Sequence, residues 1–353
     1  MKKSSMRFII LVCVMILLVP VLTACGEQEP DNSGSGLTQV TPAEATGIPQ
    51  CKDEVPVTSN LFTAEEIKTI LDEAYFNRGY DEYFLGGITY HFDEDKGTAE
   101  ATGVYQLDYE KVYIPDVIKY TENEYSVTSM QDSLFAYNTD VKQVQLSKHL
   151  TTLSASTFYG CTALETVELP EGLTEIGDNA FTECSALKEL TLPSTLTTIG
   201  TEAFYGCEML QSLVIPDGVT SIGASAFFDC SLLQSLTLSK NLTAIPDEML
   251  NNCVTLSSLV IPESVKTIGF EVFWGCSALT GITIPDSVVL MGERVFYDCA
   301  KLEEITLSKS LASVDSSMIA YCDALKTVYA GEAVAELVRA AYPMAEFEII
   351  VME

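Results

Sequence analysis

Residues 173–193 read LTEIGDNAFTECSALKELTLP, and the spacing of this stretch recurs every 23 residues through most of the chain. A fixed period of about 20–29 residues is typical of a solenoid, in which each coil buries its apolar face against its neighbours. Leucine stands three positions after each repeated cysteine, and a large apolar residue stands three positions before it. The sequence therefore predicts stacked coils with a ladder of structural cysteines inside: Cys161, Cys184, Cys207, Cys230, Cys253, Cys276, Cys299 and Cys322.

Each period also contains one short strand and one corner. Leu190 and Leu192 alternate with polar residues, as in a strand with one buried face. Pro193 then ends the strand, because proline has no amide to donate. At the corner we expect a backbone conformation that residues other than glycine resist. The glycines at this position are Gly177, Gly200, Gly223, Gly269 and Gly292.

The repeated pattern, L-x-x-I-G-x-x-A-F-x-x-C-x-x-L-x-x-L-x-L-P, closely resembles the BspA-type class of leucine-rich repeats over about residues 110–353. The resemblance implies a right-handed leucine-rich repeat solenoid of about nine coils, built mostly of strands and turns, with a parallel sheet along its concave face. It also implies an adhesin or interaction module directed at host or neighbouring-cell molecules. The coil at residues 242–264 departs most, since Pro246 replaces glycine and Leu250 replaces phenylalanine.

The flanking segments divide the chain further. Residues 61–126 predict an α+β cap before the solenoid at 127–333, and residues 334–353 a closing cap. Thr63 and Glu66 form a capping box, which begins a helix expected to reach about Asn77. Residues 88–92 and 98–104 predict two strands around a turn. The acidic turn at residues 93–95 suits a solvated hairpin tip better than a calcium loop, whose full spacing it lacks.

The first 60 residues predict a bacterial lipoprotein signal peptide at 1–24, followed by a tether at 25–60. Residues 1–24 combine a basic start with an apolar stretch too short to span a membrane comfortably. Leu22-Thr23-Ala24-Cys25 resembles the bacterial lipobox, which implies a lipid on Cys25 and a place on the extracellular face of the bacterial envelope. Residues 25–60 have the composition of a flexible acidic tether and contain Cys51.

The net charge of the chain limits the classes of partner that it could bind. The chain has 50 Asp and Glu against 19 Lys and Arg, a formal net charge of −31. Nucleic acid and anionic lipid surfaces are therefore excluded as electrostatic partners. An extracellular protein or a neutral glycan remains, although the acidity also serves solubility alone.

The cysteine ladder is open to three interpretations. Zinc sites need cysteines two to four residues apart, which argues against metal. Neighbouring coils would place Cα atoms within disulfide range, but side chains of a ladder point the same way. We expect buried free thiols that fill the corner and form weak hydrogen bonds with turn amides.

No residue pattern indicates catalysis or a cofactor. The two histidines, His91 and His149, lie far apart, and no phosphate loop or nucleophile motif accompanies them. The sequence predicts a protein that is not an enzyme. A polysaccharide hydrolase with paired carboxylates stays a remote alternative.

Two sets of exposed positions are candidates for ligand binding. The first follows the concave strands and is rich in β-branched residues, which also favour exposed strand positions for structural reasons alone: Glu168, Thr191, Val214, Thr237, Val260, Thr283 and Thr306. The second is an aromatic row after the buried phenylalanines, which could anchor a partner or simply pack over the corner: Tyr159, Tyr205, Phe228, Trp274 and Tyr297. Binding or adhesion at the cell surface is the predicted function, and a structural spacer or envelope scaffold is the alternative.

Overall fold

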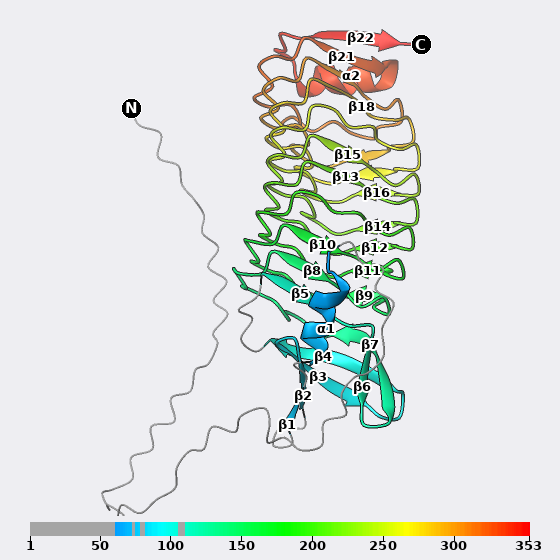
Figure 1. Cartoon of the computed structure of the whole chain (residues 1–353). Helices are drawn as coiled ribbons and strands as arrows, with labels where there is room; N and C mark the ends of the chain where they lie inside the picture. The colour runs from blue at the N-terminus through cyan, green and yellow to red at the C-terminus, as the bar shows by residue number, and fades with distance from the viewer. Residues whose placement is uncertain (1–60, 73–74, 78–81, 105–109) are drawn as a thin grey trace, which may run out of the picture. The chain divides into compact units, whose positions relative to one another are not determined.

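The computed structural model describes residues 61–72, 75–77, 82–104 and 110–353, which lie within one compact unit from Gly47 to Glu353. The described chain forms a stack of coils with a small mixed cap before it and a helix and strand after it (Figure 1). The predicted solenoid of stacked coils with parallel strand pairing is confirmed. The predicted segments 1–24 and 25–60, with Cys25 and Cys51, lie outside the described residues.

One short strand from each of most coils pairs in parallel with its neighbours. Residue i pairs with residue i + 23, as in Thr166 with Gln143 and Thr283 with Thr306. In the three-residue strands of successive coils, such as β10, β13 and β18, the middle residue is buried and its neighbours are half-buried or exposed. We call the outward side of these strands the strand face. Its strands are β5 (Lys111–Tyr113), β8 (Gln143–Gln145), β10 (Thr166–Glu168), β13 (Ser212–Val214), β15 (Ser235–Thr237), β18 (Gly281–Thr283), β20 (Glu304–Thr306) and β21 (Thr327–Gly331).

A second series of two-residue strands lies on another side of the coils and is also parallel. In five coils the corner glycine continues it by donating a hydrogen bond to the preceding coil, as Gly223 N does to Ile199 O at 2.9 Å. Pro246 has no amide to donate, and the ladder is interrupted between β14 and β16. The strands are β9 (Thr152–Leu153), β11 (Glu175–Ile176), β12 (Thr198–Ile199), β14 (Ser221–Ile222), β16 (Ala244–Ile245), β17 (Thr267–Ile268) and β19 (Leu290–Met291).

The corner glycines were expected to adopt a backbone conformation that other residues resist, and this explanation is wrong. None of the five has a positive φ. They are needed because the coils approach closely there: a Cβ on Gly223 would lie 2.3 Å from Thr201 N, and one on Gly177 would lie 2.8 Å from Leu153 O. The left-handed residues come instead five and one positions before the cysteine, as at Asn179 (φ 57°) and Glu183 (φ 59°).

The core runs continuously from the cap through the coils to the closing helix. Phenylalanine rings of successive coils stack with centroids 5.3 Å apart, from Phe135 through Phe158, Phe181 and Phe204 to Phe227. Leu250 interrupts this stack. All eight ladder cysteines are buried free thiols.

Each ladder thiol donates a hydrogen bond to a carbonyl oxygen of the preceding coil. The acceptor is the residue three positions before that coil's ladder position, at 2.9–3.2 Å from Sγ. A carbonyl is a partner to which a protonated thiol can donate. The predicted contact with a turn amide is present as well: the backbone amide of the preceding coil's ladder residue, such as that of Cys184 at Cys207, hydrogen-bonds to the sulfur.

The cap before the coils is a six-stranded sheet in the order β1-β2-β3-β4-β7-β6. The two predicted strands are confirmed as β3 and β4, with β7 parallel to β4. β5 lies within the segment that the sequence assigns to this cap, yet it pairs with β8 of the coils. The strands are β1 (Tyr75–Asn77), β2 (Glu82–Leu85), β3 (Ile88–Asp93), β4 (Thr98–Val104), β6 (Val117–Tyr120) and β7 (Asn123–Met130).

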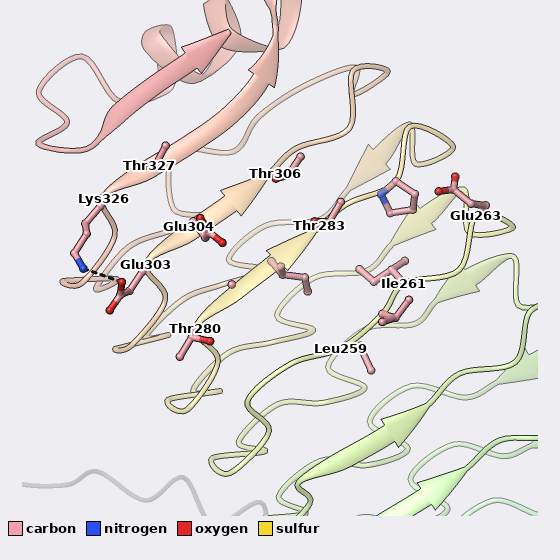
Figure 2. Close-up of a pocket in the computed structure, with 14 residues that line it drawn as sticks. Leu259, Ile261, Glu263, Thr280, Thr283, Glu303, Glu304, Thr306, Lys326 and Thr327 are labelled. Carbon is pink, nitrogen blue, oxygen red and sulfur yellow. Dashed lines mark hydrogen bonds and ion pairs between the residues drawn. The ribbon is translucent and has the colours of Figure 1, made fainter. Parts of the chain in front are cut away.

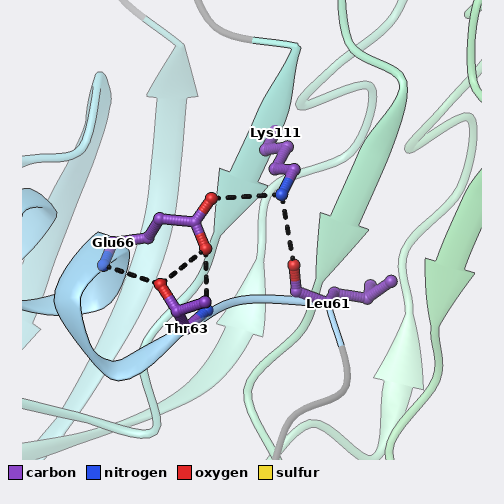
Figure 3. Close-up of polar contacts among 4 residues, drawn as sticks. All are labelled: Leu61, Thr63, Glu66 and Lys111. Carbon is purple, nitrogen blue, oxygen red and sulfur yellow. Dashed lines mark hydrogen bonds and ion pairs between the residues drawn. The ribbon is translucent and has the colours of Figure 1, made fainter.

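Helix α1 (Ala64–Asp72) packs beside this region. Its capping box is formed as predicted: Glu66 N donates to Thr63 Oγ1, and Thr63 N donates to Glu66 Oε2 at 2.7 Å (Figure 3). Lys111 Nζ on β5 lies 3.1 Å from Glu66 Oε1. The predicted end near Asn77 is wrong, because residues 75–77 form β1 and pair with β2.

The other end of the stack is closed by α2 (Glu332–Ala341) and β22 (Glu348–Met352). Val334, Ala335 and Val338 bury one face of α2. β22 pairs in parallel with β21 and so covers the edge that the last coil would expose.

Candidate functional site

The strand face brings the first set of candidate residues into one row. Paired strands place Glu168 beside Gln145, Val214 beside Thr237, and Thr283 beside Thr306. Residues 189–191 and 258–260, which contain Thr191 and Val260, occupy the equivalent stretches but do not form strands. Parallel stacking thus produces a row whose side chains come from separate coils.

Two valines in this row are unusually exposed. Val260 is 84% exposed and Val214 is 64% exposed. Most other members are threonines, which offer a hydroxyl and a methyl group from the same side chain. The row can therefore contact a partner through apolar surface and hydrogen bonds together.

A hollow of about 780 Å³ lies on the strand face around Gly281 (Figure 2). At the equivalent position of the other coils the residue has a side chain. Gly281 has no side chain, and the Glu304 side chain packs over it: a Cβ at residue 281 would lie 3.2 Å from Glu304 Cγ. The lining combines the candidate residues with polar neighbours: Val260, Thr280, Thr283, Glu303, Glu304, Thr306, Lys326 and Thr327.

Charge is gathered at one edge of the hollow. Lys326 Nζ pairs with Glu303 Oε2 at 2.7 Å, one coil apart. Glu304, the first residue of β20, is labelled beside this pair in Figure 2. Hydroxyl groups, carboxylates and one exposed valine suit an extended partner that lies across several coils, such as a peptide or a glycan.

The hollow was not predicted, although the sequence carries a signal for it. Gly281 is the single glycine in a row otherwise made of Gln143, Thr166, Glu189, Ser212, Ser235, Ser258, Glu304 and Thr327. A glycine at one exposed strand position indicates a gap in the surface or close backbone approach.

The aromatic row divides into separate groups. Tyr205 and Phe228 stack with ring centroids 4.8 Å apart and planes at 8°. Trp274 and Tyr297 lie 4.3 Å apart, and Tyr159 pairs with Tyr137. Thr182 and Asn251 interrupt the row between these groups. Because each ring lies against another, the row contributes to packing and still presents half-buried ring faces and edges.

Carboxylates surround the Tyr205 pair. Burial, followed by the negative charges of Asp229, Glu202, Glu183 and Glu248, raises the pKa of Tyr205. Burial also raises the pKa of Asp229. The turns at this point therefore present aromatic rings and carboxylates side by side.

The two histidines lie on different parts of the described chain. His91 lies on β3 and His149 follows β8. Within residues 61–353, apart from the short undescribed gaps, no group of three or more His, Cys, Asp or Glu could hold a metal ion. At the predicted hairpin tip, Lys96 Nζ pairs with Asp93 Oδ2 at 2.7 Å, and its positive charge and hydrogen bonds hold the pKa of Asp93 below its usual value.

The described helices were also compared with the requirements of a membrane span. Neither α1 nor α2 is long and apolar enough to cross a bilayer.

Comparison with known proteins gives a consistent result. The model of the BspA type leucine-rich repeat region matches residues 128–257 and 222–345, in six copies. Repeats of this type are typical of surface-associated proteins that bind other proteins and are not enzymes. Among curated proteins, none matches this chain.

Several solved structures resemble the chain. A leucine-rich repeat protein from Bacteroides ovatus is 28% identical over 76% of each chain, with a TM-score of 0.62. A T. pallidum leucine-rich repeat protein is 27% identical over 55% of this chain and 88% of its own, with a TM-score of 0.48. A leucine-rich cell surface protein from Faecalibacterium prausnitzii is 21% identical over 76% of this chain and 94% of its own, with a TM-score of 0.46.

Proposed function

Because the chain belongs to the BspA-type leucine-rich repeat family, we propose that it is a cell-surface protein that binds an extracellular protein or glycan through the strand face. The observation that carries this proposal is the exposed row of Val260, Thr283 and Thr306 beside the hollow at Gly281. Side chains of separate coils meet there, so that one partner could contact apolar methyl groups and hydroxyl groups at the same time.

The shape of this surface supports an extended ligand. A small-molecule site is usually concave and closes around most of its ligand, whereas the hollow at Gly281 spans the open surface of four neighbouring coils, from Leu259 to Thr327. Threonine hydroxyls there can hydrogen-bond to sugar hydroxyls or to a peptide backbone. The negative charge of the chain favours partners that are neutral or basic.

We also propose that Cys25 carries a lipid that holds the protein on the outer face of the envelope. The support is the sequence Leu22-Thr23-Ala24-Cys25 after an apolar stretch. The intact mass of the exported protein tests this: we expect an acylated N-terminus at Cys25, and a free amine at a later residue contradicts it.

The binding proposal is tested by exposing the purified chain to arrays of extracellular proteins and of glycans. We expect saturable binding to a defined ligand that unlabelled protein competes away. If no array member binds saturably and deletion of the gene disrupts the envelope, the protein is a structural scaffold and the proposal is wrong. Release of labelled fragments from a bound polysaccharide would instead indicate a hydrolase.

A further inference from the structure

One arginine of the chain, Arg294, lies against a ring of the aromatic row. The guanidinium carbon of Arg294 lies 5.6 Å from the centre of the Trp274 ring, and Arg294 Nη2 pairs with Glu271 Oε1 at 2.8 Å. Tyr297 lies against the same tryptophan, with centroids 4.3 Å apart. An aromatic pair and a carboxylate of two neighbouring coils therefore form a site for a guanidinium group, and Arg294 fills it.

The same arrangement occurs three coils earlier, without the arginine. Tyr205 and Phe228 stand at the positions of Trp274 and Tyr297, and Glu202 stands at the position of Glu271. The backbone is equivalent as well: Glu202 and Glu271 both have a φ of 53°. At the position of Arg294 (φ 54°) the chain has Ser225 (φ 53°), whose side chain cannot reach the rings as an arginine does.

The carboxylates at this second site have only neutral partners. Asn179 Nδ2 donates to Glu202 Oε2 at 2.8 Å, and Ser225 Oγ donates to Glu248 Oε2 at 3.3 Å. In the described part of the chain, no lysine or arginine pairs with Glu183, Glu202, Asp229 or Glu248. Four carboxylates close to Tyr205 thus create a negative potential that no described cation neutralises.

We propose that Tyr205, Phe228 and Glu202 form a binding site for an arginine side chain of a basic protein partner. The guanidinium lies against the aromatic pair as Arg294 lies against Trp274, and Glu202 and Glu248 accept its hydrogen bonds. Arginine is favoured over lysine because its planar group can stack on a ring and bind a carboxylate at the same time. This site lies on the turns and does not depend on the strand face.

The test uses two synthetic peptides of alternating glycine and arginine or glycine and citrulline, which differ in charge but hardly in shape. Isothermal titration calorimetry of the purified chain at 150 mM salt should show one binding site for the arginine peptide and at least tenfold weaker binding of the citrulline peptide.

Two variants make the site itself testable. Ser225→Arg supplies the missing guanidinium from within the chain. The equivalent position 294 already carries an arginine, so the backbone tolerates one. This variant should weaken binding of the arginine peptide about tenfold. Thr151→Arg adds the same charge at an exposed position beside β9 and should change the affinity less than twofold. Arg294→Ser vacates the Trp274 site, so the stoichiometry should rise from one peptide to two.

Three results would overturn the proposal. Equal affinity for the arginine and citrulline peptides would show that the positive charge does not contribute to binding. Equal weakening of peptide binding by Ser225→Arg and Thr151→Arg would show that the peptide is attracted by the overall charge alone. An unchanged stoichiometry in Arg294→Ser, with an unchanged melting temperature, would show that the two sites are not equivalent.

Discussion

Cys207 Sγ donates a hydrogen bond to the carbonyl oxygen of Phe181, 3.2 Å away in the preceding coil. Both side chains are fully buried, and burial raises the pKa of the Cys207 thiol well above its usual value. The thiol therefore stays protonated and remains a donor. One small side chain in each coil thus fills the corner and gives a second hydrogen bond to a carbonyl oxygen of the coil before it, which also accepts one from a backbone amide.

Replacing this thiol should destabilise the stack. Cys207→Ala leaves a small cavity and removes one of the two hydrogen bonds of the Phe181 carbonyl oxygen, which keeps the one from Cys184 N. We expect a loss of about 1–3 kcal/mol in the free energy of unfolding. Urea denaturation measures it. Gln234→Ala, at an exposed position, is the control and should stay within about 0.5 kcal/mol of the parent chain. Equal stability of both variants would mean that the thiol bond contributes nothing.

The ladder also predicts weakening at alkaline pH. Burial raises the pKa of Cys276 from 9.0 to about 12 and raises that of Cys161 to about 12. The unfolded chain then loses thiol protons above pH 9 while the folded chain keeps them, so stability falls between about pH 9 and pH 12. Each such thiol contributes a slope of about 1.4 kcal/mol per pH unit.

This slope can be assigned to one residue. Urea midpoints at pH 8, 9 and 10 should fall less steeply for Cys276→Ala than for the parent chain, because the variant has one thiol fewer to titrate. Identical slopes would assign the alkaline loss to other groups, such as the lysines and tyrosines.

Close approach of the coils predicts opposite outcomes for two glycines. An alanine Cβ at position 223 would lie 2.3 Å from Thr201 N, whereas one at position 172 would lie 3.6 Å from Lys148 O, an ordinary contact. Neither glycine has a positive φ. We expect Gly223→Ala to cost roughly 3 kcal/mol or more through displaced backbone, and Gly172→Ala to leave the melting temperature almost unchanged. Similar melting temperatures would contradict the packing explanation.

The coil at residues 242–264 should be the least protected part of the stack. Pro246 interrupts one strand series, residues 258–260 form no strand, and Leu250 interrupts the phenylalanine stack. Native-state hydrogen exchange should show faster exchange of its amides than of those at residues 281–303, where β18 pairs with β20. Uniform protection through the two coils would contradict this.

The period of 23 residues was enough to predict the coils, their interior residues and the alignment of the strand face, because stacked equivalent positions must face the same way. The contacts between coils were harder. The role of Gly223 depends on a distance to Thr201, and the end of α1 depends on the pairing of Tyr75 with Phe84. Arg294 and Trp274 are 20 positions apart, and only the stacking of their coils places the cation on the ring. The hollow at Gly281 likewise depends on the side chains of neighbouring coils that surround this glycine.

The most direct test of the proposed binding role is the location of the bound ligand. With a ligand found on the arrays, affinities should be compared for Thr283→Arg, which adds a long side chain at the hollow, and for Thr220→Arg, which adds the same side chain at an exposed position beside β14. We predict at least a tenfold loss for Thr283→Arg and less than a twofold change for Thr220→Arg. Equal affinities of the two variants, both folded, would contradict binding through the strand face.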